Sequence, residues 1–281
     1  MTPNEWRAGG ELFAWRGHQI FCRAAGDGDP LLLVHGFPTA SWDWSMVWPA
    51  LAKHYRVLAL DLIGYGFSAK PRDFDYTVFA QADLVEAFLE REGVTRYRLL
   101  AHDFGDTVAQ ELLARHEATR IVSACLLNGG LFPEVHRATT IQKLLASPIG
   151  PLIARLSSYR TFAKSMRGIW GDHPVHESEL RGMWQLVTEH QGMRVMPKLI
   201  GYMAERRANR ARWVGAITGA TIPIRFINGL EDPVSGAHAV ARYRELVPDP
   251  NVVELARVGH YPQVEAPEAV TVAVLDHFGR R

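Results

Sequence analysis

The residue with the clearest chemical consequence is Asp103, which stands in the segment HDFG. A strand-like run ends at Ala101 just before it, and a helix-like run with small residues follows it. This order of strand, sharp turn and helix is that of the G-x-S-x-G nucleophile elbow, with Asp103 in the position of the serine. Asp is also a favoured N-cap residue, so the turn alone leaves a structural role open.

Three further segments stand in the places and in the chain order that such an elbow requires. The run HGFP directly follows the strand-like run Leu31 to Val34, where a backbone N–H can help to form an oxyanion hole. Asp232 in GLEDPV and His260 in GHYP come later, giving the order nucleophile, acid and histidine. We therefore expect Asp103, Asp232 and His260 to be catalytic, and Phe37 and Phe104 to supply the backbone N–H donors.

A carboxylate nucleophile restricts the reaction. It is ionised at neutral pH and needs no base to attack, but it is a poor nucleophile toward amides and esters. It suits an sp³ carbon that carries a leaving group. Attack by Asp103 gives an alkyl ester on the enzyme, and His260, oriented by Asp232, then activates a water to hydrolyse that ester.

Competing residues carry weaker signals. Asn128 stands where such folds can also supply the acid, but it is an amide, so Asp232 is preferred. His35 and His102 flank the expected site, and we interpret both as supporting residues. Ser68 follows a different strand, where no nucleophile is expected, so an esterase is disfavoured.

The elements that must position these residues alternate between short apolar runs and amphipathic runs. Such alternation predicts a mostly parallel central sheet flanked by helices. The expected strands are 31–34, 57–60, 98–101, 121–127, 224–227 and 252–255, and the expected helices are 77–91 and 106–115. Residues 131–213 lack a strand-like run and are too long for one crossover connection. We therefore predict a core of residues 1–130 and 214–281 with an inserted helical cap at 131–213.

Composition excludes several classes of function. The 281 residues are 47% hydrophobic and 22% charged, with a formal net charge of +1, which disfavours a nucleic-acid partner or attraction to an acidic membrane. Cys22 and Cys125 have no partners at metal-ligand spacing, so neither a metal nor another cofactor is predicted. The absence of a secretory signal and of a membrane-spanning run predicts a cytoplasmic protein. The sequence leaves a homodimer open.

Longer segments resemble the aspartate-nucleophile branch of the α/β-hydrolases, which contains epoxide hydrolases, haloalkane dehalogenases and the mesoderm-specific transcript proteins. The resemblance runs from Leu31 to the C-terminus and is carried by HGFPTASWDW, DLIGYGFSAKP, HDFGDTVAQELL, LLNGGLFPEVHR, RWVGAI, GLEDPV and GHYPQVEAP. It implies the α/β-hydrolase fold and hydrolysis through an enzyme ester. The run NGGLFPEVHR with RWVGAI is most similar to the mesoderm-specific transcript group, which implies no particular substrate.

The resemblance leaves two reactions open. Haloalkane dehalogenases hold the halide with side-chain N–H groups at the positions of Phe37 and Phe104, and neither residue has one. Epoxide hydrolases open the ring with cap tyrosines, and Tyr202 stands where one of them is expected. Tyr159 is a weaker second candidate, with His173, His176 and Trp170 as others. We favour an epoxide hydrolase, with a haloalkane dehalogenase as the alternative.

The remaining pocket is expected to be apolar and to bind a small apolar or aromatic substrate. Its expected lining residues, besides those above, are His35, Pro38, Trp42, Phe132, Tyr159, Trp170 and Met203. The alternative from another class of function is a binding protein on an inactive hydrolase fold, because a fold does not determine a function. Loss of turnover when Asp103 is substituted would distinguish an enzyme from such a binding protein.

Overall fold

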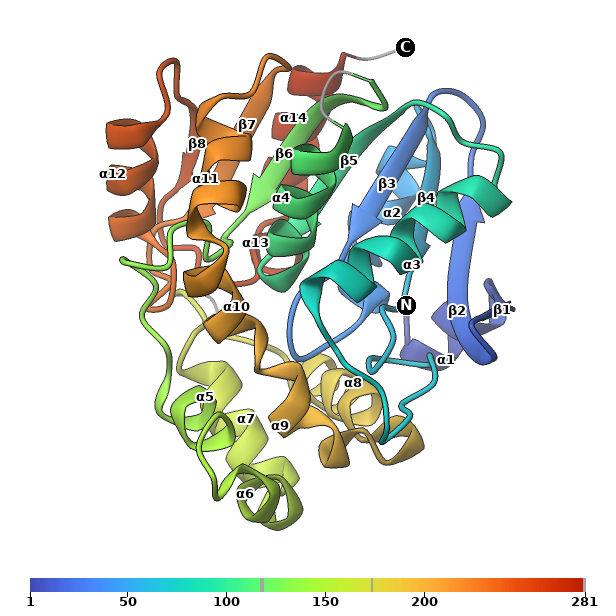
Figure 1. The fold of residues 1–281 in the computed structure, drawn as a ribbon, viewed down its shortest axis with the longest axis vertical. Helices are drawn as coiled ribbons and strands as arrows, with labels where there is room; N and C mark the ends of the chain where they lie inside the picture. Colours follow the sequence, from blue (N-terminus) through green and yellow to red (C-terminus); the bar gives the residue numbers. More distant parts are fainter. Residues whose placement is uncertain (117–118, 173, 280–281) are drawn as a thin grey trace.

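A sheet of eight strands forms the centre of the molecule (Figure 1), in a computed structural model that describes residues 1–116, 119–172 and 174–279. The strand order is β1-β2-β4-β3-β5-β6-β7-β8, with antiparallel pairing of β1 with β2 and of β2 with β4, and parallel pairing elsewhere. The strands are β1 (Glu11–Trp15), β2 (His18–Ala25), β3 (Pro30–Val34), β4 (Arg56–Leu60), β5 (Tyr97–His102), β6 (Ile121–Leu127), β7 (Ile224–Gly229) and β8 (Asn251–Leu255). This confirms the predicted mostly parallel sheet.

Alternation along the central strands divides the core into two layers. In β3, Leu32 and Val34 face one side of the sheet, while Leu31 and Leu33 face the other, and all four are fully buried. Successive strand side chains point to opposite faces, so both faces of this strand need a cover of helices. The continuous apolar run LLLV is therefore the signature of a strand buried on both faces.

Helices cover both faces of the sheet (Figure 1). On one face α4 packs against β3, β5 and β6 and lies between α3 and α11, while on the other α14 packs against β6, β7 and α2. These helices are α2 (Trp48–Leu51), α3 (Val78–Arg91), α4 (Phe104–His116), α11 (Arg210–Thr218) and α14 (Pro267–Phe278), with α12 (Ala237–Leu246) against β7. The two helices predicted from the sequence, 77–91 and 106–115, correspond to α3 and α4.

The strands β1 and β2 form an antiparallel hairpin that the sequence analysis did not identify. Arg16 and Gly17 connect them, both with positive φ (47° and 80°), as the mirror-image turns of hairpins require. Burial in β1 alternates weakly, with Phe13 and Trp15 facing inward. An Arg-Gly turn lacks the strong Asn-Gly or Asp-Gly signal, which explains why the hairpin was missed.

The segment between β6 and β7 is helical and gathers at the lower end of the sheet in Figure 1. The helices that precede α11 in this segment are α5 (Thr140–Leu145), α6 (Gly150–Leu156), α7 (Tyr159–Arg167), α8 (Glu177–Thr188), η2 (Glu189–Arg194), α9 (Met196–Leu199) and α10 (Tyr202–Ala208). The expected cap boundary at residue 213 falls inside α11, which packs against α4 beside the sheet. Short helices near the N-terminus and the site complete the fold, namely α1 (Pro3–Ala8), η1 (Ser41–Trp44) and α13 (Pro262–Glu265). Across the described ranges, no helix is long and apolar enough to cross a membrane.

Candidate active site

Asp103 occupies a strained turn between β5 and α4. Its φ of 48° lies in the left-handed region, where residues with a Cβ are uncommon and where strain is often associated with function. Glycines allow the close approach around it. A Cβ on Gly105 would lie 2.2 Å from the Val34 carbonyl oxygen, and one on Gly36 would lie 2.8 Å from the Asp103 Cβ. The geometry is that of the nucleophile elbow.

The two carboxylate oxygens of Asp103 have different surroundings. Oδ2 accepts a hydrogen bond from the backbone N–H of Phe37 at 3.0 Å. Within the described residues, Oδ1 has no hydrogen-bond partner, although the side chain is only 1% exposed. A backbone donor therefore polarises Oδ2, while the lone pairs of Oδ1 remain free to attack.

His260 and Asp232 lie on the turns that follow β8 and β7, and the fold brings both next to Asp103. Nδ1 of His260 lies 2.7 Å from Oδ2 of Asp232, and its Nε2 lies 3.9 Å from Oδ1 of Asp103. Burial opposes the imidazolium, but the charges of Asp232 and Asp103 outweigh it and raise the pKa of His260 to about 9. The resting site thus holds a protonated imidazole between two carboxylates.

Asp232 is held in its ionised form by several donors. It accepts hydrogen bonds from the Asn128 Nδ2 at 3.0 Å, the Val234 N–H at 2.8 Å, and both the N–H and the hydroxyl of Ser235. Burial raises its pKa, but the charge of His260 and these hydrogen bonds lower it further, to about 2. Asn128, which the sequence analysis set aside as an acid, therefore positions the acid.

Phe104 contributes its ring rather than a visible hydrogen bond. Among the described residues, no hydrogen bond joins its N–H to the Asp103 carboxylate, so Phe37 is the donor observed there. The Phe104 ring packs between Tyr65, at 5.9 Å, and Tyr202, at 4.8 Å between centroids. The second oxyanion donor thus stays a prediction.

Tyr202 begins α10 and is fully buried beside the elbow. Its ring contacts those of Phe37 and Phe104, and its hydroxyl lies 3.4 Å from the Gln142 Nε2. Burial, with a smaller contribution from the Asp103 charge, raises its pKa above the usual value. The phenol is therefore protonated at neutral pH and available as a hydrogen-bond donor.

Arg206 is a site residue that the sequence analysis missed. This cap residue is 2% exposed, and its Nη2 donates to the Asp103 carbonyl oxygen at 3.1 Å and lies 3.8 Å from Oδ1. Its Nε donates to the Thr107 hydroxyl at 2.6 Å. The available signal was its spacing of four from Tyr202, because residues one helical turn apart share a face.

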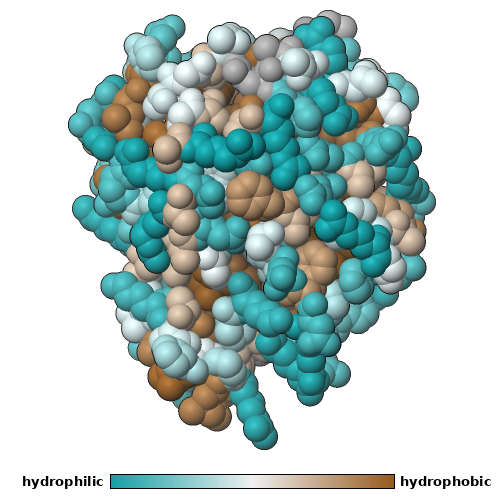
Figure 2. Space-filling view, in the orientation of Figure 1, coloured by the Kyte–Doolittle hydropathy of each residue, from teal (hydrophilic) through white to brown (hydrophobic). Residues whose placement is uncertain are grey.

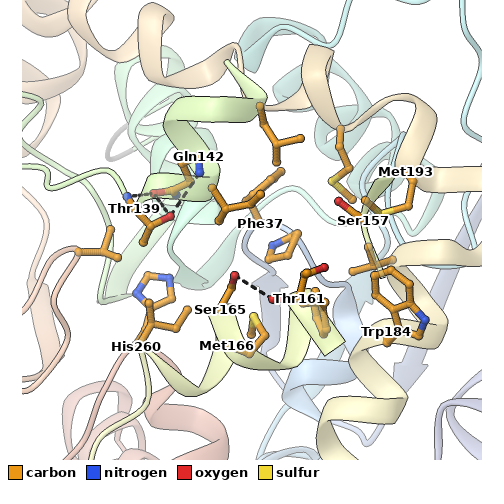
Figure 3. Close-up of a pocket in the computed structure, with 18 residues that line it drawn as sticks. Phe37, Thr139, Gln142, Ser157, Thr161, Ser165, Met166, Trp184, Met193 and His260 are labelled. Carbon is orange, nitrogen blue, oxygen red and sulfur yellow. Dashed lines mark hydrogen bonds between the residues drawn. The ribbon is translucent and has the colours of Figure 1, made fainter. Parts of the chain in front are cut away.

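An apolar pocket leads away from this group. Figure 3 shows His260 at one end and Trp184 at the other, with Phe37 between them. The cavity has a volume of about 100 Å³. Its lining residues are Phe37, Pro38, Thr139, Ile141, Gln142, Leu145, Ser157, Thr161, Phe162, Ser165, Met166, Ile169, Trp184, Val187, Met193, Met196, Val234 and His260. Most of its wall comes from cap helices.

Several expected lining residues lie outside this pocket. The Tyr159 hydroxyl donates to Glu177 at 2.6 Å on the outer surface of the cap, so Tyr159 does not reach the site. The Trp42 Nε1 donates to the Met1 carbonyl oxygen, and Trp170 stacks on Tyr261. Cap packing placed these rings, which loop position alone could not predict.

Three more expected lining residues are buried elsewhere. Phe132 packs near Tyr243, and Met203, in α10, is buried in the core. His35 supports the oxyanion loop, because its Nε2 accepts from the Leu62 N–H at 3.0 Å.

Of the other suggested proton donors, His176 is exposed at the start of α8, and His173 lies outside the described residues. In the ranges that the structure describes, no group of three His, Cys, Asp or Glu side chains could hold a metal ion.

Residues 29–267 match the protein family described as alpha/beta hydrolase fold. The chain is 40% identical to the human mesoderm-specific transcript homolog protein, covering 94% of this chain and 84% of that protein. It is 39% identical to "Putative hydrolase LipZ" of Mycobacterium tuberculosis, over 98% and 97%. It is 27% identical to haloalkane dehalogenase 2 of Mycobacterium bovis, over 90% and 89%.

Solved structures show the same architecture. An alpha/beta hydrolase fold protein from Burkholderia ambifaria superposes with a TM-score of 0.82 at 25% identity, covering 95% of this chain and 97% of that one. The epoxide hydrolase CorEH superposes with a TM-score of 0.78 at 19% identity, over 96% and 98%, and this likeness concerns the fold alone.

Proposed function

Because the chain belongs to the alpha/beta hydrolase fold family, we propose that it is a hydrolase that acts through a covalent ester on Asp103, with an epoxide as its substrate. The observation that carries the proposal is the asymmetric carboxylate at the elbow. One oxygen is held by the Phe37 N–H, and the other, beside the His260 imidazole, accepts no hydrogen bond from the described residues. This is the arrangement that a carboxylate nucleophile needs.

The first step forms a carbon–oxygen bond between Oδ1 and an sp³ ring carbon. The carbon–oxygen bond of the epoxide breaks, and its oxygen takes a proton from the Tyr202 phenol or from solvent through it. Alkylation removes the negative charge of Asp103, one of the charges that raise the pKa of His260. The imidazole can then give its proton, through solvent, to the Tyr202 phenolate, which restores the phenol and leaves His260 as a base.

The second step hydrolyses the enzyme ester. His260 takes a proton from water, and the oxygen of that water attacks the Asp103 carboxyl carbon. Charge develops on Oδ2, where the Phe37 N–H donates. The bond between the carboxyl carbon and Oδ1 breaks, and the diol leaves with Oδ1 after taking the proton back from His260. Asp103 therefore keeps the oxygen of the water, and the second proton of that water passes from the Asp103 carboxylic acid to His260, which restores the carboxylate and the imidazolium.

A single turnover in ¹⁸O-labelled water tests this route. We expect the label on Asp103, located by peptide mass spectrometry, and unlabelled oxygen in the first diol. Label found only in the product would contradict an ester on Asp103. Asp103→Asn should abolish both turnover and labelling. If the wild type binds epoxides, bromoalkanes or esters but turns over none of them, the protein is a binding protein instead.

The choice of epoxide over halide is supported by the side-chain donors near Asp103. The buried Tyr202 phenol is in contact with the rings of Phe37 and Phe104, neither of which carries a side-chain N–H. The second candidate, a haloalkane dehalogenase, is favoured by the 27% identical relative of that name. Trp184, at the far end of the pocket, is the one tryptophan in its described lining.

Tyr202→Phe distinguishes the two candidates. We expect a loss of about 10² in the rate of diol formation from styrene oxide, because general acid catalysis contributes that order of magnitude. Bromide release from a bromoalkane should not depend on the phenol. Tyr159→Phe, a matched change on the outer surface of the cap, should leave both rates unchanged. Bromide release without diol formation by the wild type would reverse the ranking.

A further inference from the structure

The first cap helices concentrate positive charge that the whole chain does not show. Residues 135–171 contain six Lys and Arg and no Asp or Glu, whereas the other 244 residues contain 25 Lys and Arg with all 30 Asp and Glu. The net charge of +1 therefore conceals a basic segment on an otherwise acidic molecule. A local field of this kind attracts anionic partners even when the whole chain is nearly neutral.

Four of these cations are exposed and free of acidic partners. Among the described residues, no carboxylate lies within 4.0 Å of the charged groups of Lys143, Arg155, Arg160 or Lys164, and all four residues are exposed. The neighbouring Glu177 of α8 already pairs with Arg167 and Arg181. The described residues therefore leave the charge on this surface without a neutralising carboxylate.

Large apolar side chains are exposed in the same segment. Ile149, Leu152 and Leu156 are 51%, 54% and 68% exposed. Ile149 is the N-cap of α6, and the spacing of three and four places it on the same side as Leu152 and Leu156 within the helix. Figure 2 shows apolar side chains at the lower tip of the molecule, where Figure 1 places α6. On α7, Arg160 and Lys164 lie one turn apart on the exposed side, opposite the buried Ala163 and Met166.

We propose that this basic apolar surface, made of Lys143, Ile149, Leu152, Leu156, Arg160 and Lys164, docks the cap onto an anionic lipid surface. Leucine side chains that enter the headgroup region, beside cations that contact anionic headgroups, are the features of an interfacial helix. The same helices supply Leu145, Ser157 and Phe162 to the pocket wall. Docking thus brings the pocket next to the phase in which apolar substrates concentrate.

A second copy of this chain fits the surface less well. A twofold contact would bring each patch onto its own equivalent, and the unpaired cations of the two copies would face each other without carboxylates between them. A lipid surface satisfies the apolar side chains and the cations together. It also requires no specific fold in the partner.

Vesicle flotation of the full chain tests the proposal without any assay of activity. Binding is compared between vesicles of phosphatidylcholine alone and vesicles in which a third of the lipid is phosphatidylglycerol. We expect binding to the anionic vesicles that falls as salt is added. Arg160→Gln with Lys164→Gln should lower the partition coefficient about 25-fold, since each cation near such a surface contributes about a factor of five. Leu152→Ser with Leu156→Ser should lower it about tenfold.

Matched controls lie elsewhere on the surface. Lys53→Gln with Arg96→Gln removes two exposed cations, and Val272→Ser removes an apolar side chain that is 57% exposed on α14. Both should bind like the wild type, and circular dichroism checks that every variant folds. No binding to anionic vesicles, or equal losses in the controls, overturns the proposal. Two other results also overturn it. One is a dimer, seen by sedimentation, that Leu152→Ser dissociates, and the other is binding of an oligonucleotide that is weakened only by the changes to the cations.

Discussion

The core places Asp103, Asp232 and His260 on turns that directly follow strands, whereas the cap places Tyr202 and Arg206 one turn apart on a short helix. Hydrogen bonds to the backbone and to Asn128 hold the core residues in place. The cap residues depend on how α10 packs over the elbow. In the proposed mechanism, the attack by the nucleophile thus depends on residues held by the sheet, whereas protonation of the leaving group depends on how the cap packs.

The strongest test of the role of the core residues is the variant His260→Gln. We expect kcat to fall about 10⁴-fold, because in the proposed mechanism the imidazole is required for ester hydrolysis but not for alkylation. The alkyl enzyme should accumulate, which intact-protein mass spectrometry detects as an added mass on Asp103. His176→Gln, on an exposed cap histidine, serves as the control. Absence of the adduct while turnover is lost would show that His260 is also needed for the first step.

The role of the cap residues is tested by the variant Arg206→Gln. Its guanidinium lies 3.8 Å from Oδ1, the oxygen that leaves with the product in the proposed mechanism, so we expect ester hydrolysis to slow by about 10²-fold while alkylation persists. Arg206→Lys should recover part of the rate because it keeps the charge. Arg207→Gln changes the exposed neighbouring arginine on the same helix.

Single-turnover rates of adduct formation and decay separate the two steps. A purely structural role for Arg206 would slow both steps together and lower Tm, with no rescue by lysine. That result would exclude a direct role of Arg206 in ester hydrolysis and leave Tyr202 as the cap residue that acts in the reaction.

The smallest expected effect is on stability. The pKa of His260 is raised from 6.5 to about 9, so its pairing stabilises the folded state below pH 6.5, and that stabilisation is lost as the pH rises to about 9. The pKa of Asp232 is lowered from 3.8 to about 2, so its contribution is present above pH 4 and is lost as the pH falls toward 2. The difference in unfolding free energy between wild type and His260→Gln should therefore shrink between pH 6.5 and 9. A constant difference in urea titrations would argue against the charged pair.

The sequence indicated the elbow because its signals are local. A strand that ends in HDFG and runs into a helix, and loops after strands that carry Asp232 and His260, can be recognised without knowing which residues meet. The same holds for the parallel sheet, since strands such as LLLV that are buried on both faces read as continuous apolar runs. The hairpin β1–β2 lacked a strong turn signal and was not recognised.

Other features depended on contacts between distant parts of the chain. Arg206 reaches the carbonyl oxygen of a residue 103 positions earlier, and Tyr159 points to the outer surface because α7 packs on α8.

By itself, the sequence determined a carboxylate at an elbow, its acid and histidine in order, and the sheet that carries them, because each follows from the periodicity and turn chemistry of a few adjacent residues. Only the tertiary structure decided which oxygen of Asp103 is free, which cap side chains face it, and where charge gathers on the surface. The reason is physical, since helix packing in the cap is governed by the fit of side chains from several helices, and no short segment encodes that fit.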